Sequence, residues 1–251
     1  MVIKWDLTIP QLSGDQVRRG YVYLPESYDE DPDRRYPVMY FFDGHNVFFD
    51  EDATFGTSWG MNDYMEESHK ELILVGIECN REGNGRLEEY SPFTFENSEL
   101  GRIKGRGKQY MHWLIKELKP YIDETYRTLP DRENTLIAGS SMGGLMALYA
   151  VTTFNQVFQR AACLSPSLWV SPGKILELIA RAHTRRDTCI YLDYGAGEMF
   201  NHTSNAEALF STSHLLMTKR VNLTFRIVPD GTHCEASWAK QVPIFMDCLG
   251  V

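Results

Sequence analysis

The chain has 251 residues, of which 43% are hydrophobic and 24% are charged. These proportions exclude a disordered chain, and we expect one globular domain that spans residues 1–251. The formal net charge of −9 repels polyanions and no aromatic and basic stripe offsets it, so nucleic acid is not an expected partner.

The N-terminal segment and the cysteines favour a cytoplasmic protein. Lys4 and Asp6 interrupt the start of the chain, which lacks the apolar run and cleavage site of a signal peptide. No stretch reaches the roughly 18 apolar residues that cross a bilayer, so no membrane contact is expected. The cysteines are odd in number and widely spaced, which is typical of reduced thiols: Cys79, Cys163, Cys189, Cys234 and Cys248.

Alternating and then continuous apolar runs predict a mixed sheet. Trp5, Leu7 and Ile9 alternate with polar residues, and a second alternating run over residues 17–24 completes an expected antiparallel hairpin. The later runs are continuously apolar, as in parallel strands that helices cover on both faces. These runs span residues 37–42, 72–77, 134–139, 160–164, 188–194 and 222–228.

Helical spacing separates several of these runs. Apolar residues recur every third or fourth position from Met111 to Ile122, and less regularly over residues 203–219. Pro120 lacks a backbone donor and is expected to kink or interrupt the first helix. Residues 101–108 are basic and rich in glycine, and we interpret them as a solvated loop. The order predicts an α/β fold with an antiparallel start, a βαβ body and helices on both faces.

The strongest local motif is Gly139-Ser140-Ser141-Met142-Gly143-Gly144, which lies between a predicted strand and the helical segment 145–151. This G-x-S-x-G pattern on a strand-to-helix turn presents a serine hydroxyl above the edge of the sheet. We therefore predict Ser141 as a nucleophile. The backbone N–H of Met142, at the start of the helix, is positioned to stabilise an oxyanion.

A serine nucleophile needs a base, which in such a sheet follows the last strand. His233 lies directly after the run 222–228 and before a helical segment that starts at Glu235, so we predict His233 as the base. The third member is a carboxylate between Ser141 and His233 in chain order. Asp193 and Glu198 both fit, and we favour Glu198 because the flexible Gly195-Ala196-Gly197 turn precedes it.

The loop Asp43-Gly44-His45-Asn46 follows the run 37–42 and is expected to complete the oxyanion site. The N–H of His45 is the predicted second donor. The side chain of Asn46 either binds substrate or makes hydrogen bonds within the loop.

Substrate contacts are predicted more loosely. Arg86 follows the run 72–77 and either orients a polar part of the substrate or pairs with Glu89, three residues on. Trp59 and Trp169 either line the pocket or belong to the core. His233, Cys234 and Glu235 are adjacent and point in different directions, so neither a metal nor a cofactor is expected.

These residues together resemble the Putative esterase family of α/β-hydrolases, which contains esterase D-like S-formylglutathione hydrolases, feruloyl and acetyl-xylan esterases, siderophore esterases and mycolyltransferases. The resemblance covers nearly the whole chain after residue 15. It implies Ser141, Glu198 and His233 as the triad, with His45 and Met142 as the oxyanion hole. It is carried by D-G-H-N from Asp43 with Trp59 shortly after, R-x-x-E-Y-S-P from Arg86, E-L-x-P-Y-I-D from Glu117, Y-R-T-L from Tyr126, G-S-S-M-G-G from Gly139, S-P-S-L-W from Ser165, and G-T-H from Gly231 with a later Trp238.

The residues and the resemblance predict a serine carboxylic-ester hydrolase that acts on a small-molecule ester. We expect a short acyl group because no long lid insertion is visible, and a sugar or another polar alcohol as the alcohol part. Alternatives that stay open are an acyltransferase with the same triad, an amidase or peptidase, and a non-catalytic binding protein of the same fold. Assembly into a homo-oligomer also stays open.

Overall fold

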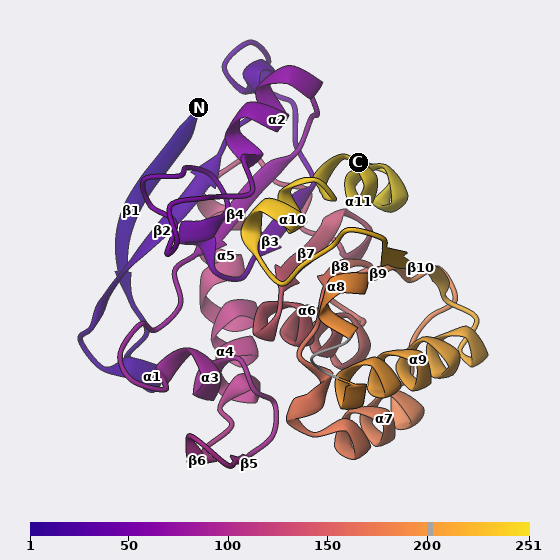
Figure 1. Ribbon diagram of the computed structural model, residues 1–251. Coiled ribbons are helices and arrows are strands. Elements are labelled where there is room, and N and C mark those ends of the chain that lie inside the picture. Colours follow the sequence, from indigo (N-terminus) through magenta and orange to yellow (C-terminus); the bar gives the residue numbers. More distant parts are fainter. Residues whose placement is uncertain (200–202) are drawn as a thin grey trace.

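An eight-stranded sheet forms the centre of the computed structural model, which describes residues 1–199 and 203–251 (Figure 1). The strand order is β1-β2-β4-β3-β7-β8-β9-β10. Strand β2 is antiparallel to both β1 and β4, and all later neighbours in the sheet are parallel. The strands of this sheet are β1 (Val2–Thr8), β2 (Val17–Tyr23), β3 (Val38–Phe41), β4 (Ile73–Ile77), β7 (Thr135–Ser140), β8 (Arg160–Leu164), β9 (Cys189–Gly195) and β10 (Asn222–Val228).

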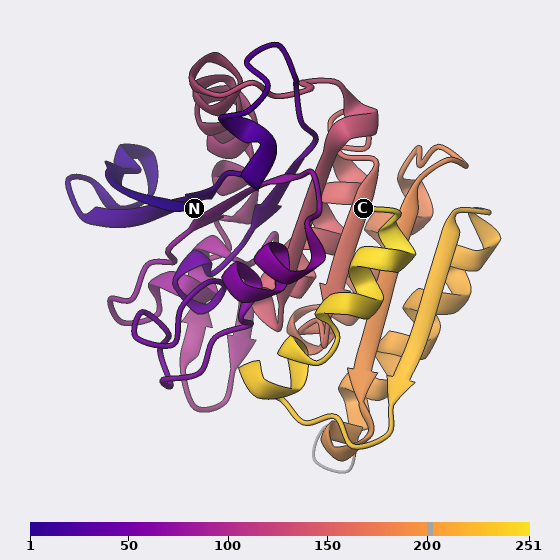
Figure 2. The same cartoon turned by 90° about the horizontal axis from the view of Figure 1, so that it is seen from above.

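Helices cover both faces of the sheet, so the predicted three-layer arrangement is confirmed (Figure 2). One face carries α2 (Met61–Ser68), α10 (Glu235–Ala239) and α11 (Val242–Leu249). The other carries α4 (Gly107–Trp113), the π-helical segment η3 (Leu114–Leu118), α5 (Lys119–Thr125), α6 (Met142–Thr153), α7 (Pro172–Arg181) and α9 (Thr203–Thr218). Short elements complete the connections: α1 (Pro10–Ser13), η1 (Glu26–Tyr28), η2 (Gly44–Asn46), α3 (Gly85–Glu89), β5 (Phe95–Asn97), β6 (Gly101–Ile103), η4 (Arg132–Asn134), η5 (Leu168–Val170) and α8 (Ala196–Met199).

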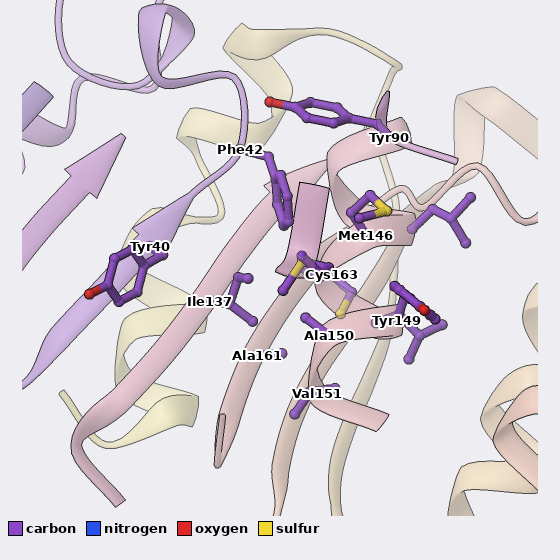
Figure 3. Packing of buried hydrophobic residues seen from close by; sticks show 14 of the residues in the cluster. Tyr40, Phe42, Tyr90, Ile137, Met146, Tyr149, Ala150, Val151, Ala161 and Cys163 are labelled. Carbon is purple, nitrogen blue, oxygen red and sulfur yellow. The ribbon is translucent and has the colours of Figure 1, made fainter. Parts of the chain in front are cut away.

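Burial on both faces explains why the central strands are continuously apolar. Side chains alternate between the faces of a strand, so neighbouring residues of β3 enter different cores. Tyr40 packs in the cluster beneath α6, whereas Met39 and Phe41 pack beneath α2 and α11. Figure 3 shows part of the cluster beneath α6, with Ile137 from the sheet and Ala150 from α6 among the labelled residues. The sheet is therefore held as a rigid base, and its carboxyl edge carries the loops that hold the predicted site residues.

Two local predictions have different outcomes. Pro120 lies in the first turn of α5, and the π-helical turn before it accommodates the missing donor, so the expected interruption is present. The solvated loop expected over residues 101–108 is wrong in part, because Gly101–Ile103 pairs with β5 and Gly107 begins α4. The Arg106 guanidinium donates to the carbonyls of Leu12 and Gln11, so it serves packing.

Among the residues described, no helix is long and apolar enough to span a bilayer. All five cysteines are free thiols, and Cys79 and Cys163 are buried. Burial raises the pKa of both thiols above its ordinary value, which keeps them protonated.

Candidate active site

Ser141 occupies a sharp turn between β7 and α6. Its backbone has φ 57° and ψ −120°, a left-handed conformation that a residue with a Cβ atom rarely adopts. Close backbone packing explains the flanking glycines, because a Cβ on Gly139 would lie 2.6 Å from the carbonyl of Gly143. The Ser141 N–H donates to the carbonyl of Leu164 on β8, at 3.0 Å. These contacts hold the Ser141 hydroxyl above the carboxyl edge of the sheet.

The loops after β9 and β10 cross closely above the same edge. A Cβ on Gly231 would lie 2.8 Å from the Cα of Gly195, and the N–H of Gly197 donates to the carbonyl of Gly231 at 3.0 Å. This crossing carries His233 and Glu198 toward each other although they are 35 positions apart in the chain.

The predicted base and acid form a continuous chain of hydrogen bonds with Ser141. His233 Nε2 is 2.9 Å from Ser141 Oγ, and His233 Nδ1 is 2.6 Å from Glu198 Oε2. The second carboxylate oxygen of Glu198 accepts from the Ser165 hydroxyl at 2.7 Å and from the Gly195 N–H at 3.1 Å. Glu198 is only 4% exposed, so its charge interacts with the imidazole in a weakly screened environment.

Asp193, the other acid weighed from the sequence, is bonded elsewhere. Its Oδ1 accepts from the Ser165 N–H at 3.0 Å, and its Oδ2 accepts from the Tyr191 hydroxyl at 2.9 Å. Burial raises the pKa of Asp193 to about 6, although these hydrogen bonds lower it in part. The described contacts therefore pair His233 with Glu198, whereas Asp193 makes its hydrogen bonds with Ser165 and Tyr191.

Two backbone amides are the predicted oxyanion donors. His45 lies on η2 after β3, and Met142 is the first residue of α6. In the hydrogen bonds of the described residues, neither amide donates to a backbone carbonyl, so both are free for an oxyanion. The His45 side chain is buried and bonded to Thr54 Oγ1 at 3.0 Å, and burial lowers its pKa and keeps the imidazole neutral.

The loop from Asp43 to Asn46 is fixed by an ion pair that the sequence did not reveal. Arg86 Nε and Nη2 each donate to Asp43 at 2.8 Å. The alternative prediction that Arg86 pairs with Glu89 is therefore wrong. Glu89 instead pairs with buried Arg18 at 2.7 Å. Burial alone would raise the pKa of Asp43, but the charge and hydrogen bonds of Arg86 hold it below its usual value.

A cavity of about 440 Å³ opens beside Ser141 and His233. Asn46 lines it and donates to Glu235 at 3.1 Å, and Arg86 lines it with a side chain that is one-third exposed. The other lining residues are His45, Thr54, Phe55, Cys79, Asn80, Arg81, Gly83, Ser140, Glu235 and Trp238. A larger cavity of about 810 Å³ lies near α7 and has none of the predicted site residues in its lining.

The expected tryptophans do not line this cavity. Trp59 is 4% exposed and packs edge-on against Phe41 and Phe245, because its apolar ring lies in the core beneath α2 and α11. Trp169 packs edge-on against Phe95, outside the cavity. Trp238, to which sequence reasoning gave no role, does line it; its position on the helix that follows His233 was the available signal.

One further cluster has the residue types of a metal site. Ligand atoms of Asp43, His45 and Cys79 lie within 4.8 Å of one another. Both oxygens of Asp43, however, already accept from the Arg86 cation. The cluster is therefore neutralised by a guanidinium group, and its geometry fits the support of the loop.

The strand order, the turn at Ser141 and the loops that follow β9 and β10 define an α/β-hydrolase. More narrowly, the chain belongs to the Putative esterase family, whose model matches residues 13–244.

Individual relatives agree with this assignment. The chain is 22% identical to the ferri-bacillibactin esterase BesA of Bacillus subtilis, over 85% of this chain and 78% of BesA. It is 26% identical to the uncharacterised protein YbbA of the same organism, over 61% of this chain, and that alignment spans only 58% of YbbA.

Solved structures share the fold. An IroE-like serine hydrolase from Shewanella oneidensis matches with a TM-score of 0.76 at 20% identity, over 98% of this chain and 81% of that one. The BES protein of Bacillus cereus matches with a TM-score of 0.73 at 20% identity, over 100% of this chain and 95% of that one. A ferulic acid esterase matches with a TM-score of 0.71 at 18% identity, over 99% and 98%.

Proposed function

We propose that this protein hydrolyses carboxylic esters through an acyl-enzyme formed on Ser141. The observation that carries the proposal is the unbroken line of hydrogen bonds from Ser141 Oγ through His233 to buried Glu198, at 2.9 and 2.6 Å. Membership in a family of esterases supports the same chemistry. Together they favour catalysis over a purely binding role for this fold.

The chemistry follows from the hydrogen-bond directions. The Nδ1–H of His233 donates to Glu198, so Nε2 carries the lone pair that accepts the proton of Ser141. As this proton leaves, Oγ forms a bond to the ester carbonyl carbon. The imidazolium then gives the proton to the departing alcohol oxygen. Water, deprotonated by the same Nε2, adds to the acyl-enzyme. The bond from the acyl carbon to Oγ then breaks, the imidazolium returns its proton to Oγ, and the acid is released.

The surrounding structure lowers the energy of the charged intermediates. The oxyanion accepts from the amides of His45 and Met142, which do not have to reorganise during the reaction. Loss of one such donor typically reduces the rate by about 10² to 10³. Buried Glu198 stabilises the imidazolium through a short, charge-assisted contact.

The cavity supports a small ester with a polar part. Its volume of about 440 Å³ suits a short acyl group, and Asn46 and Arg86 provide polar contacts on its wall. We assign these two side chains to substrate binding and withdraw Trp59 and Trp169. Relatives carry names that refer to different esters, a ferri-bacillibactin esterase and a ferulic acid esterase, so a substrate panel is required.

The test compares p-nitrophenyl acetate, butyrate and longer esters with wild-type protein, Ser141→Ala and the control Ser213→Ala. Ser213 is a buried serine on α9 whose hydroxyl bonds to Phe210. We expect activity toward short esters in wild type and control, and its loss in Ser141→Ala. Equal hydrolysis by all three proteins would contradict the proposal. Product analysis with added alcohols, acetylated sugars, feruloyl esters, S-formylglutathione and siderophore lactones then separates hydrolysis from transfer and narrows the substrate.

A further inference from the structure

Ser165 lies directly after β8, behind Glu198, and is 2% exposed. Its φ of 40° is a left-handed value that serine rarely adopts. The Ser165 N–H donates to Asp193 Oδ1, which holds the residue in this conformation. Its hydroxyl group lies between Glu198 and Trp238, at 2.7 and 3.1 Å. Ser165 does not line the cavity, and the steps proposed above do not use it.

Donor and acceptor chemistry sets the direction of this chain of contacts. An indole N–H only donates, and an ionised carboxylate only accepts. The Ser165 hydroxyl must therefore accept from Trp238 Nε1 and donate its own proton to Glu198 Oε1. The Gly195 N–H donates to the same oxygen. With Oε1 fully engaged, Oε2 is left facing His233 Nδ1.

Trp238 also contacts the base directly. Its ring and the imidazole of His233 have centroids 5.0 Å apart at 83°, an edge-to-face arrangement. The indole is 5% exposed and lies on α10, close after His233 in the chain. The Trp238 side chain therefore contacts the imidazole of His233 through its ring, and its N–H is linked to the carboxylate of Glu198 through the hydroxyl of Ser165.

We propose that Trp238 and Ser165 are positioning residues that orient Glu198 and His233 as one unit, with Asp193 as the anchor of Ser165. The inference rests on the proposed esterase function. The hydroxyl of Ser165 fixes which oxygen of Glu198 meets the imidazole, and the ring of Trp238 limits the tilt of that imidazole. A triad held in this way is oriented before the substrate arrives.

The test uses Ser165→Ala and Trp238→Phe, with Ser213→Ala and Trp113→Phe as controls of similar burial away from the site. We expect Ser165→Ala to lower kcat by about 10- to 100-fold, with KM within about twofold. We also expect the acidic limb of the pH profile of kcat/KM to move to higher pH, because the carboxylate of Glu198 then meets fewer donors and attracts the protonated base more strongly. Trp238→Phe keeps the ring and loses the N–H, so a loss of about 3- to 10-fold is expected.

The double variant provides the sharpest readout. Because both residues act through one hydrogen-bond chain, Ser165→Ala/Trp238→Phe should match Ser165→Ala alone within about twofold. Multiplied losses in the double variant, or a Ser165→Ala protein with the kcat and pH profile of Ser213→Ala, would overturn the inference. If Ser165→Ala does not fold, Trp238→Phe against Trp113→Phe decides by the same kcat and pH readouts. Failure of the proposed function would look different, since wild-type protein would then hydrolyse no ester, or Ser141→Ala would hydrolyse esters as fast as wild type.

Discussion

Replacing Glu198 by glutamine should disable the base while leaving the fold intact. Two donors, the Ser165 hydroxyl and the Gly195 N–H, meet Oε1 and therefore select the amide oxygen of glutamine for that position. The amide NH₂ group is left facing His233 Nδ1, where Oε2 lies at 2.6 Å in the native protein. The imidazole must then carry its proton on Nε2 and cannot accept one from Ser141.

This wrong tautomer sets the expected magnitude. A comparable acid-to-amide change in a serine protease lowers kcat by about 10⁴, and we expect a loss of about 10³ to 10⁴ for Glu198→Gln. In energy this is about 4 to 5.5 kcal/mol of transition-state stabilisation. The melting temperature should change little, because glutamine retains the size of the side chain.

Asp193→Asn is the matched comparison. The asparagine oxygen still accepts from the Ser165 N–H, and its NH₂ group meets the Tyr191 hydroxyl, which rotates to accept and points its proton toward Gln241. Each polar group that contacts residue 193 thus keeps a hydrogen-bond partner, so we expect a loss of kcat/KM below about tenfold. The assay is kcat/KM for p-nitrophenyl butyrate. A larger loss in Asp193→Asn than in Glu198→Gln would refute the assignment of Glu198 as the triad acid.

Further variants test the support of the site. Arg86→Gln leaves buried Asp43 unpaired and should lower the free energy of unfolding by about 3 kcal/mol in urea titrations. The control Arg81→Gln, at a half-exposed side chain, should change this free energy by less than about 0.5 kcal/mol. Equal effects of the two variants would argue against the ion pair. Gly143→Ala places a Cβ 2.9 Å from the Cβ of Phe42 and 3.2 Å from Oδ2 of Asp43 and should lower kcat at least about tenfold, whereas Gly173→Ala, with open space around it, should leave kcat unchanged. Because the pKa of Asp193 is raised, the native state holds the proton of this carboxyl to higher pH than the unfolded chain does. The free energy of unfolding of wild type should therefore fall by about 2 to 3 kcal/mol relative to that of Asp193→Asn as pH rises from about 4 to about 6. If the difference in stability between wild type and Asp193→Asn is constant over this pH range, the pKa of Asp193 is not raised.

Much of the fold follows from local patterns. The runs at 134–139 and 188–194 correspond to β7 and β9 with a shift of one residue, because strands buried on both faces leave a continuous apolar signature. The turn at Ser141 is local in part, since Gly139 is required by its contact with Gly143, whereas Gly143 and Gly144 approach Phe42 and Leu164 from distant segments. The crossing of the loops after β9 and β10 is a tertiary feature. The sequence alone therefore left both Asp193 and Glu198 as candidates for the acid that contacts His233.

The remaining site residues depend on contacts between distant segments. Arg86 meets Asp43, which is 43 positions away, and no spacing rule predicts such a pair over the nearby Glu89. Trp59 and Trp238 are equally apolar in sequence terms and are buried in the same core cluster, yet only Trp238 also lines the cavity. An aromatic side chain serves either place equally well, so only the path of the backbone distinguishes them.

The most direct measurement is the site of covalent labelling by a fluorophosphonate, read by mass spectrometry of the digested protein. We predict one adduct on the peptide that contains Ser141, formed in step with the loss of ester hydrolysis and blocked by prior addition of substrate. Ser141→Ala should remain unlabelled, and His233→Ala should label far more slowly. An adduct on another residue, or full ester hydrolysis by a protein labelled at Ser141, would contradict acyl transfer through this serine.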